Sequence, residues 1–152
     1  MKTEQTISVL NDLLHITNDR IEGFEKVEGK IWEKYPDVKG EYDHMISQSK
    51  IMKIELINLI TEINGQPQDS PSVAGALHRA WIDIKNSFLF ANVESTLENV
   101  VFGEKAAIKA YEDAIKSGSL SGRSLEIVTE HLKSIKESYH QFEKMEEYKK
   151  KE

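Results

Sequence analysis

Apolar residues recur at steps of three and four along four segments of the chain, which is the spacing of one face of an α-helix. These segments cover about residues 6–34, 40–64, 93–117 and 121–148. Pro36 ends the first segment, because a proline biases the residue before it away from helical geometry, and an Asn-Gly-X-Pro stretch at Asn64 ends the second. The pattern therefore predicts an all-α protein with four long helices.

The connections between the segments predict how the helices are ordered. Short links follow the first and third segments, and the second of these links, SGSLSG at residues 117–122, is typical of a tight helix hairpin. Between the two hairpins lies a long crossover, about residues 65–92, whose apolar spacing from Val73 to Phe88 predicts a short helix inside it. Two antiparallel hairpins joined by one long crossover favour an up-down-down-up four-helix bundle, which is the ferritin-like architecture.

Length, composition and charge limit the function without identifying it. The 152 residues suit one domain, residues 1–152, and the absence of cysteine excludes thiolate metal sites and favours a cytoplasmic location. The formal net charge of −6 opposes binding to nucleic acid. No apolar run has the length of a signal peptide core or a membrane span. We therefore expect a cytoplasmic protein that binds neither nucleic acid nor membranes.

Two stretches carry a resemblance to a known group of proteins. LNDLLHITNDRIEGFEKV, from Leu10, and NGQPQDSPSVAGALHRAWIDIK, from Asn64, resemble an uncharacterised bacterial family of ferritin-like four-helix-bundle proteins, over nearly the whole chain. More distantly, the chain is similar to bundles of the bacterioferritin and rubrerythrin type, in which a ligand glutamate stands where this chain has Thr17. The resemblance implies the ferritin-like fold, and it implies no particular activity because that family has no settled one.

Ferritin-like di-metal proteins take one inward glutamate from each of two helices and an inward Glu-x-x-His pair from each of the other two. Glu137 and His140 have the required spacing, and Glu22 and Glu55 could supply the other carboxylates. The apolar stripes argue against this site, because a bundle ligand must share the stripe of the core. They place Glu137 and His140 on a solvated face, Glu22 away from the core, and Glu55 at its edge.

Glu104 is the one candidate ligand that the helical phase turns inward. An unpaired buried carboxylate is costly, so we expect it to have a partner, a metal or a proton. Three residues that the phase also turns inward could donate a hydrogen bond to it, namely Tyr139, Thr17 and Ser49. The favoured interpretation is a satisfied buried polar group, and the alternative is a single-metal or small-ligand site between Glu104 and Tyr139.

The histidines give no second metal site. We expect His15 and His44 to be exposed, so that the Glu-x-x-His spacing ending at His44 is accidental. His131 should lie at the boundary of the fourth helix's core, where it could support the buried carboxylate through Tyr139. His78 falls in the crossover, where packing of the short helix onto the bundle is the favoured role.

The sequence contains no nucleophile elbow, P-loop or dinucleotide fingerprint. It predicts a non-enzymatic helical scaffold with a degenerate metal site and no cofactor, which forms a dimer or binds an unidentified protein partner. Trp81 and Phe88 of the crossover would be available for such contacts. The alternative is a ferritin-like di-metal carboxylate protein that binds or oxidises iron, supported by the architecture and by Glu104.

Overall fold

The computed structural model describes residues 2–25, 36–69 and 93–150, and all regular secondary structure within these ranges is helical. The four helices are α1 (Lys2–Glu25), α3 (Pro36–Glu62), α5 (Val93–Lys116) and α6 (Gly122–Lys150). They confirm the predicted all-α class and the four long helices. The end of the first predicted helix, residues 26–34, and the crossover helix with His78, Trp81 and Phe88 lie outside the described residues.

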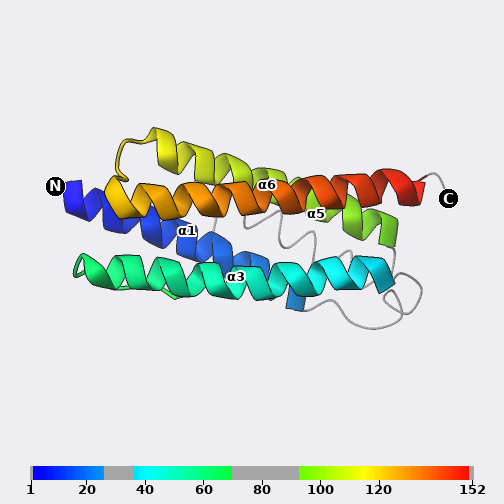
Figure 1. The fold of residues 1–152 in the computed structure, drawn as a ribbon, viewed down its shortest axis with the longest axis horizontal. Helices are drawn as coiled ribbons and strands as arrows, with labels where there is room; N and C mark the ends of the chain where they lie inside the picture. The colour runs from blue at the N-terminus through cyan, green and yellow to red at the C-terminus, as the bar shows by residue number, and fades with distance from the viewer. Residues whose placement is uncertain (1, 26–35, 70–92, 151–152) are drawn as a thin grey trace.

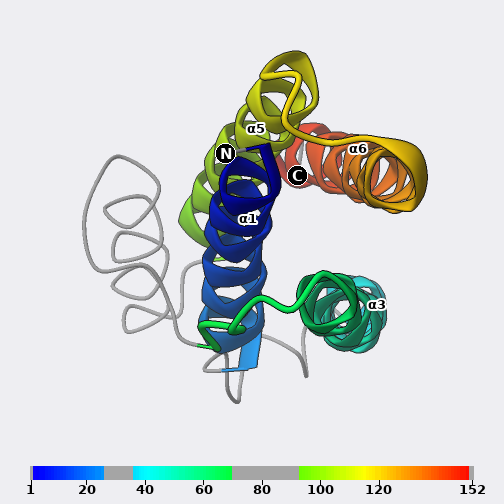
Figure 2. The same ribbon diagram turned by 90° about the vertical axis from the view of Figure 1, so that its left-hand side faces the viewer.

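The helices form a four-helix bundle of two antiparallel hairpins, as predicted. In Figure 1, α1 and α6 run in one direction along the long axis, and α3 and α5 run in the other. The most extensive contacts join α1 to α3 and α5 to α6, and the two hairpins meet through contacts of α3 with α6 and of α1 with α5. Figure 2 shows this arrangement from one end of the bundle. The order along the chain is therefore up-down-down-up.

The start of α3 differs from the predicted one. The helix begins at Pro36, whereas the sequence predicted a start near Gly40 and treated Pro36 as a break. Proline fits the first turn of a helix, because the N–H that it lacks would have no intrahelical partner there. The same residue can therefore end one helix and begin the next.

The predicted end of α3 at the Asn-Gly pair is confirmed. Asn64 has a φ of 63°, and the N–H of Gly65 donates to the carbonyl of Ile60 at 2.8 Å, which satisfies a terminal carbonyl of the helix. A Cβ atom at Gly65 would lie 2.8 Å from Cγ2 of Ile60 and 2.9 Å from Cγ1 of Ile7. A glycine at this position therefore allows the turn to pack against α1.

Two groups of buried apolar side chains fill the interior of the bundle. The larger group comes mainly from the four helices and comprises Leu10, Leu13, Leu14, Ile16, Met52, Leu56, Leu59, Ile60, Ala107, Tyr111, Ala114, Leu120, Val128, Leu132 and Ile135. A smaller group lies toward the beginning of α3 and α5 and the end of α6, and comprises Tyr42, Met45, Val100 and Phe142. The rings of Tyr42 and Phe142 pack edge to face with centroids 5.2 Å apart.

A second face of α1 is also buried, because it holds the stretch that follows α3. Asn11 donates to the carbonyl of Gln66 at 3.2 Å and accepts from the N–H of Gln68 at 2.8 Å. Asn18 donates to Asp69 at 2.8 Å. These contacts fix residues 66–69 along α1, and the sequence did not predict them. None of the described helices is long and apolar enough to cross a membrane.

Candidate functional site

A layer of buried polar side chains separates the two apolar groups. Each helix contributes one residue to this polar layer, Arg20 from α1, Ser49 from α3, Glu104 from α5 and Ser138 from α6. Arg20, Ser49 and Glu104 are 0% exposed, and Ser138 is 3% exposed. On α3, α5 and α6 the polar residue lies in chain order between the members of the two groups. The polar layer therefore interrupts the apolar interior of the bundle.

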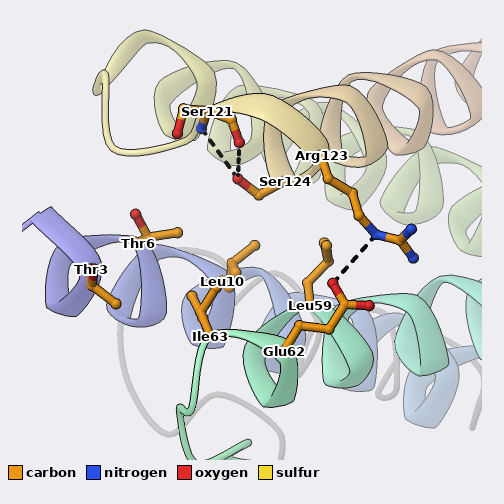
Figure 3. Close-up of a pocket in the computed structure, with 9 residues that line it drawn as sticks. All are labelled: Thr3, Thr6, Leu10, Leu59, Glu62, Ile63, Ser121, Arg123 and Ser124. Atoms are coloured by element: carbon orange, nitrogen blue, oxygen red, sulfur yellow. Dashed lines mark hydrogen bonds and ion pairs between the residues drawn. The ribbon is translucent and has the colours of Figure 1, made fainter.

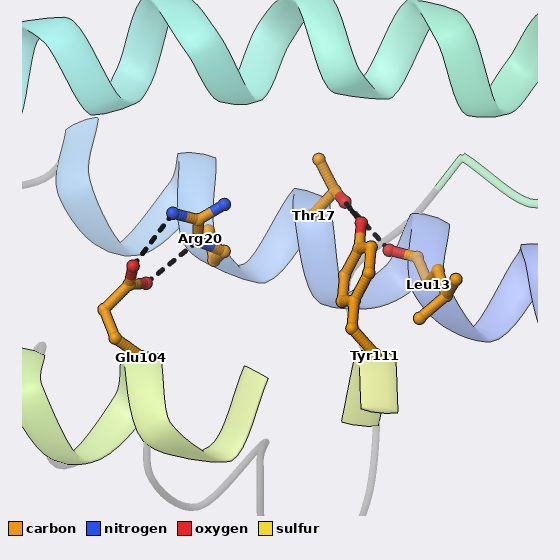
Figure 4. A network of polar contacts seen from close by, with 5 residues as sticks. All are labelled: Leu13, Thr17, Arg20, Glu104 and Tyr111. Atoms are coloured by element: carbon orange, nitrogen blue, oxygen red, sulfur yellow. Dashed lines mark hydrogen bonds and ion pairs between the residues drawn. The ribbon is translucent and has the colours of Figure 1, made fainter. Parts of the chain in front are cut away.

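Arg20 and Glu104 form a bidentate ion pair at the centre of this layer. Nε of Arg20 donates to Oε1 of Glu104 at 2.9 Å, and Nη2 donates to Oε2 at 3.0 Å (Figure 4). Both side chains are buried, at 1% and 0% exposure. The remaining nitrogen of Arg20, Nη1, points away from the carboxylate in Figure 4 and has no hydrogen-bond partner among the described residues. Both oxygens of the carboxylate therefore accept a hydrogen bond, whereas one nitrogen of the guanidinium donates none to the described residues.

Burial and the charge of Arg20 act in opposite directions on the pKa of Glu104. Burial raises the pKa of Glu104 above its ordinary value, and the charge and hydrogen bonds of Arg20 oppose that rise. Removing two charges from water costs several kcal/mol per ion, which their attraction offsets only with good geometry. The pair is therefore a weak source of net stability, but removing one partner alone would leave an uncompensated buried charge.

Thr17 and Tyr111 form the next polar contact between α1 and α5. The hydroxyl of Thr17 donates to the carbonyl of Leu13 at 2.9 Å, so the hydroxyl of Tyr111, 3.4 Å away, is the donor in the contact between the two side chains (Figure 4). Burial raises the pKa of Tyr111 to about 12, with the bond to Thr17 acting against the rise. Tyr111 is therefore neutral at physiological pH.

His131 lies deeper than predicted. It is 3% exposed, its Nε2 lies 3.2 Å from Oε1 of Glu55, and its ring centroid is 6.2 Å from that of Tyr111. Burial lowers the pKa of His131, against the opposing effect of Glu55. The predicted link from His131 to the buried carboxylate through Tyr139 is wrong, because Tyr139 donates to Glu143 at 2.7 Å.

The inward orientation of Glu104 is confirmed, but its predicted partners are not. Thr17 and Ser49 are buried as expected, yet Thr17 bonds to Leu13 and Tyr111, and Oγ of Ser49 has no partner among the described residues. The partner is Arg20, which the sequence analysis missed. A usable signal was present, because Thr17 follows Leu13 by four residues and Arg20 follows Thr17 by three, which places all three on one helical stripe.

The remaining candidate ligands lie outside the polar layer. Glu137 and His140 are exposed, as the apolar stripe predicted, and so is His44. Glu55 is at the edge of the core, with 43% of its side chain exposed. Glu22 is partly exposed.

The residues around Glu104 do not fit the metal of a ferritin-type bundle. Both carboxylate oxygens already accept hydrogen bonds from a buried cation, whereas a metal would need further anionic or imidazole ligands beside them. Within residues 2–25, 36–69 and 93–150, no group of three or more His, Asp, Glu or Cys side chains is placed to hold a metal ion.

Comparison with known proteins identifies one family. A family model described as a domain of unknown function, DUF2383, matches residues 5–117, which include most of α1, all of α3 and α5, and both Arg20 and Glu104. No curated protein and no solved structure matches the chain.

Proposed function

The chain belongs to the DUF2383 family, and we propose that it is a non-enzymatic helical scaffold of ferritin-like ancestry in which an internal ion pair takes the place of a metal. The observation that carries this proposal is the guanidinium of Arg20, which contacts both carboxylate oxygens of Glu104. The up-down-down-up order of the helices supports the ferritin-like relationship, although a fold alone does not fix a function.

The ion pair argues against metal chemistry in the interior for an electrostatic reason. A divalent cation at Glu104 would face the positive charge of Arg20 within the same low-dielectric layer. Binding would require Arg20 to leave the carboxylate, and its buried charge would then lose its partner. The Glu-x-x-His pair at Glu137 and His140 cannot help, because both residues face outward.

The outer face of α3 supports self-association as the way in which the scaffold works. Ile51 and Ile54 are 61% and 59% exposed on this face. In an antiparallel contact between the α3 helices of two copies, related by a two-fold axis between these residues, Ile51 lies opposite the partner's Ile54.

Iron binding distinguishes this proposal from the alternative function. Protein purified without a chelating tag would receive Fe(II) under anaerobic conditions and then oxygen. The proposal expects neither stoichiometric iron binding nor a ferric chromophore. A ferritin-like di-metal protein that binds or oxidises iron would give both, and would lose both in Glu104→Gln but not in the exposed control Glu126→Gln.

Light scattering coupled to size-exclusion chromatography tests the self-association. The wild-type chain should have the mass of a dimer, and Ile51→Ser combined with Ile54→Ser should give the mass of a monomer with an unchanged circular dichroism spectrum. Lys109→Ser, an exposed change on α5, serves as the control and should remain dimeric. A monomeric wild-type protein would contradict self-association through α3.

A further inference from the structure

A pocket lies at the end of the bundle that holds the turn between α5 and α6 and the end of α3. It has a volume of about 370 Å³ and lies between the start of α1, the end of α3 and the start of α6. Its volume falls within the range of about 300–1,000 Å³ that is usual for sites of small organic ligands. Figure 3 shows the lining side chains of the two hairpins facing one another across it.

The pocket has an apolar floor and one cation at its edge. Leu10, Leu59 and Ile63 form the apolar part, and the first two are almost completely buried. Arg123, from the first turn of α6, reaches across toward α3, and its Nε lies 3.4 Å from Oε2 of Glu62 (Figure 3). A ligand with an apolar body and an anionic head would match both parts.

The other polar groups of the pocket are largely committed to the backbone. Thr6 donates to the carbonyl of Ser119, and the hydroxyl of Ser124 donates to the carbonyl of Ser121 and accepts from its N–H. These hydroxyls therefore hold the turn between α5 and α6 in place. The guanidinium of Arg123 is the group best able to orient a ligand, since its partner Glu62 makes a single long contact.

A ligand carboxylate can replace Glu62 as the partner of Arg123 with little loss of stability. The two side chains are 66% and 49% exposed, and exposed ion pairs of this kind contribute little to stability. A ligand carboxylate can approach the guanidinium with two parallel hydrogen bonds, which is a stronger geometry than the present contact. The first turn of α6, where Arg123 lies, also carries the positive end of the helix dipole.

We propose that this pocket binds a small amphipathic carboxylate, whose apolar chain enters the part lined by Leu10, Leu59 and Ile63 and whose carboxylate replaces Glu62 on Arg123. The class comprises medium-chain fatty acids and similar monocarboxylates. The site is separate from the polar layer and from the outer face of α3, so it stands independently of the function proposed above.

Isothermal titration with sodium octanoate tests the site, with octanol as the matched ligand that lacks the charge. Octanoate should bind saturably with one site per chain, and octanol should bind at least about tenfold more weakly, the loss expected for one charge-assisted contact. The absence of saturable octanoate binding, or equal binding of octanol, would overturn the proposal.

Two variants that break the same ion pair should change octanoate affinity in opposite directions. Arg123→Gln should weaken binding by about tenfold, and Glu62→Gln should strengthen it by roughly twofold to fivefold, because the competing carboxylate is removed. Lys109→Gln breaks an exposed pair with Asp113 elsewhere on α5 and should leave the affinity unchanged. If Arg123→Gln has no effect, or both pocket variants shift affinity in the same direction, the assignment of the carboxylate to Arg123 is wrong.

Discussion

Replacing Arg20 with methionine removes the cation from the polar layer and keeps an unbranched apolar side chain in its place. Glu104 is 0% exposed, and in the variant its carboxylate would have no positive partner among the described residues. Loss of one partner of a buried ion pair costs about 3–5 kcal/mol. The free energy of unfolding of small domains is about 5–15 kcal/mol in total, so the variant should remain folded but be markedly less stable.

The pH dependence of Arg20→Met identifies the cause of this loss. Burial already raises the pKa of Glu104, and Arg20→Met removes the charge and hydrogen bonds of Arg20 that oppose this rise. The folded variant should then hold a proton on Glu104 over a pH range in which the unfolded chain has released it. The stability of Arg20→Met should therefore fall as the pH rises above the ordinary glutamate value of 4.5. The penalty should be smallest in acid.

A double variant completes this prediction. Arg20→Met combined with Glu104→Leu removes both charges and should recover most of the loss, because a buried ion pair can be replaced by apolar residues at little or no cost. Two observations favour recovery. Nη1 of Arg20 and Oγ of Ser49 already lack hydrogen-bond partners among the described residues, so the present layer is itself incompletely satisfied.

Urea unfolding followed by circular dichroism measures these effects, and thermal unfolding should show a decrease of roughly 6–20 °C in Tm for Arg20→Met. Lys109→Met is the control, since Lys109 is 78% exposed and pairs with Asp113 on the surface. It should change the free energy of unfolding by no more than about 0.5 kcal/mol. A loss below about 1 kcal/mol for Arg20→Met, or a double variant as unstable as the single one, would refute the reasoning.

Two further predictions concern the close packing at Gly65, after the end of α3, and the buried side chain of His131 on α6. Gly65→Ala should destabilise the protein by about 1–3 kcal/mol, because its Cβ would lie 2.8 Å from Ile60, whereas Gly40→Ala, with nothing within 4 Å, should stabilise it by about 0.5–1 kcal/mol. Thermal unfolding compares them, and equal effects would contradict the close approach. Burial lowers the pKa of His131, so stability should fall as the pH drops below 6.5, where the unfolded chain takes up the proton first. His131→Gln should flatten this slope in urea unfolding series, and an unchanged slope would exclude His131 as its source.

The helical periodicity was sufficient to predict the bundle, because apolar residues recur every three or four positions along each helix. The length of this apolar stripe predicts the length of the helix. It also placed Glu104 inside and Glu137 and His140 outside, since side-chain direction follows from rotation along the helix. The ends of the helices depend on local chemistry instead. Proline is compatible with the end of one helix and with the start of the next, and the predicted start of α3 near Gly40 was therefore four residues later than the observed start at Pro36.

The candidate site was only half predictable, because burial of a charged residue depends on a partner from another helix. Arg20 has a helical phase that fits the core of α1, but a single arginine is normally assigned to the surface. Its pairing with Glu104, 84 positions along the chain, is fixed by the packing of α1 against α5. His131 was misplaced for a related reason, since its partner Glu55 belongs to α3.

Nuclear magnetic resonance of the Arg20 Nε–H group, during titration with paramagnetic Mn(II), tests the central claim most directly. An ion pair that stands in place of a metal predicts a resonance that exchanges slowly with water and is not broadened by stoichiometric Mn(II). A rapidly exchanging Nε–H, or broadening that centres on Glu104 and disappears in Glu104→Gln, would contradict the account.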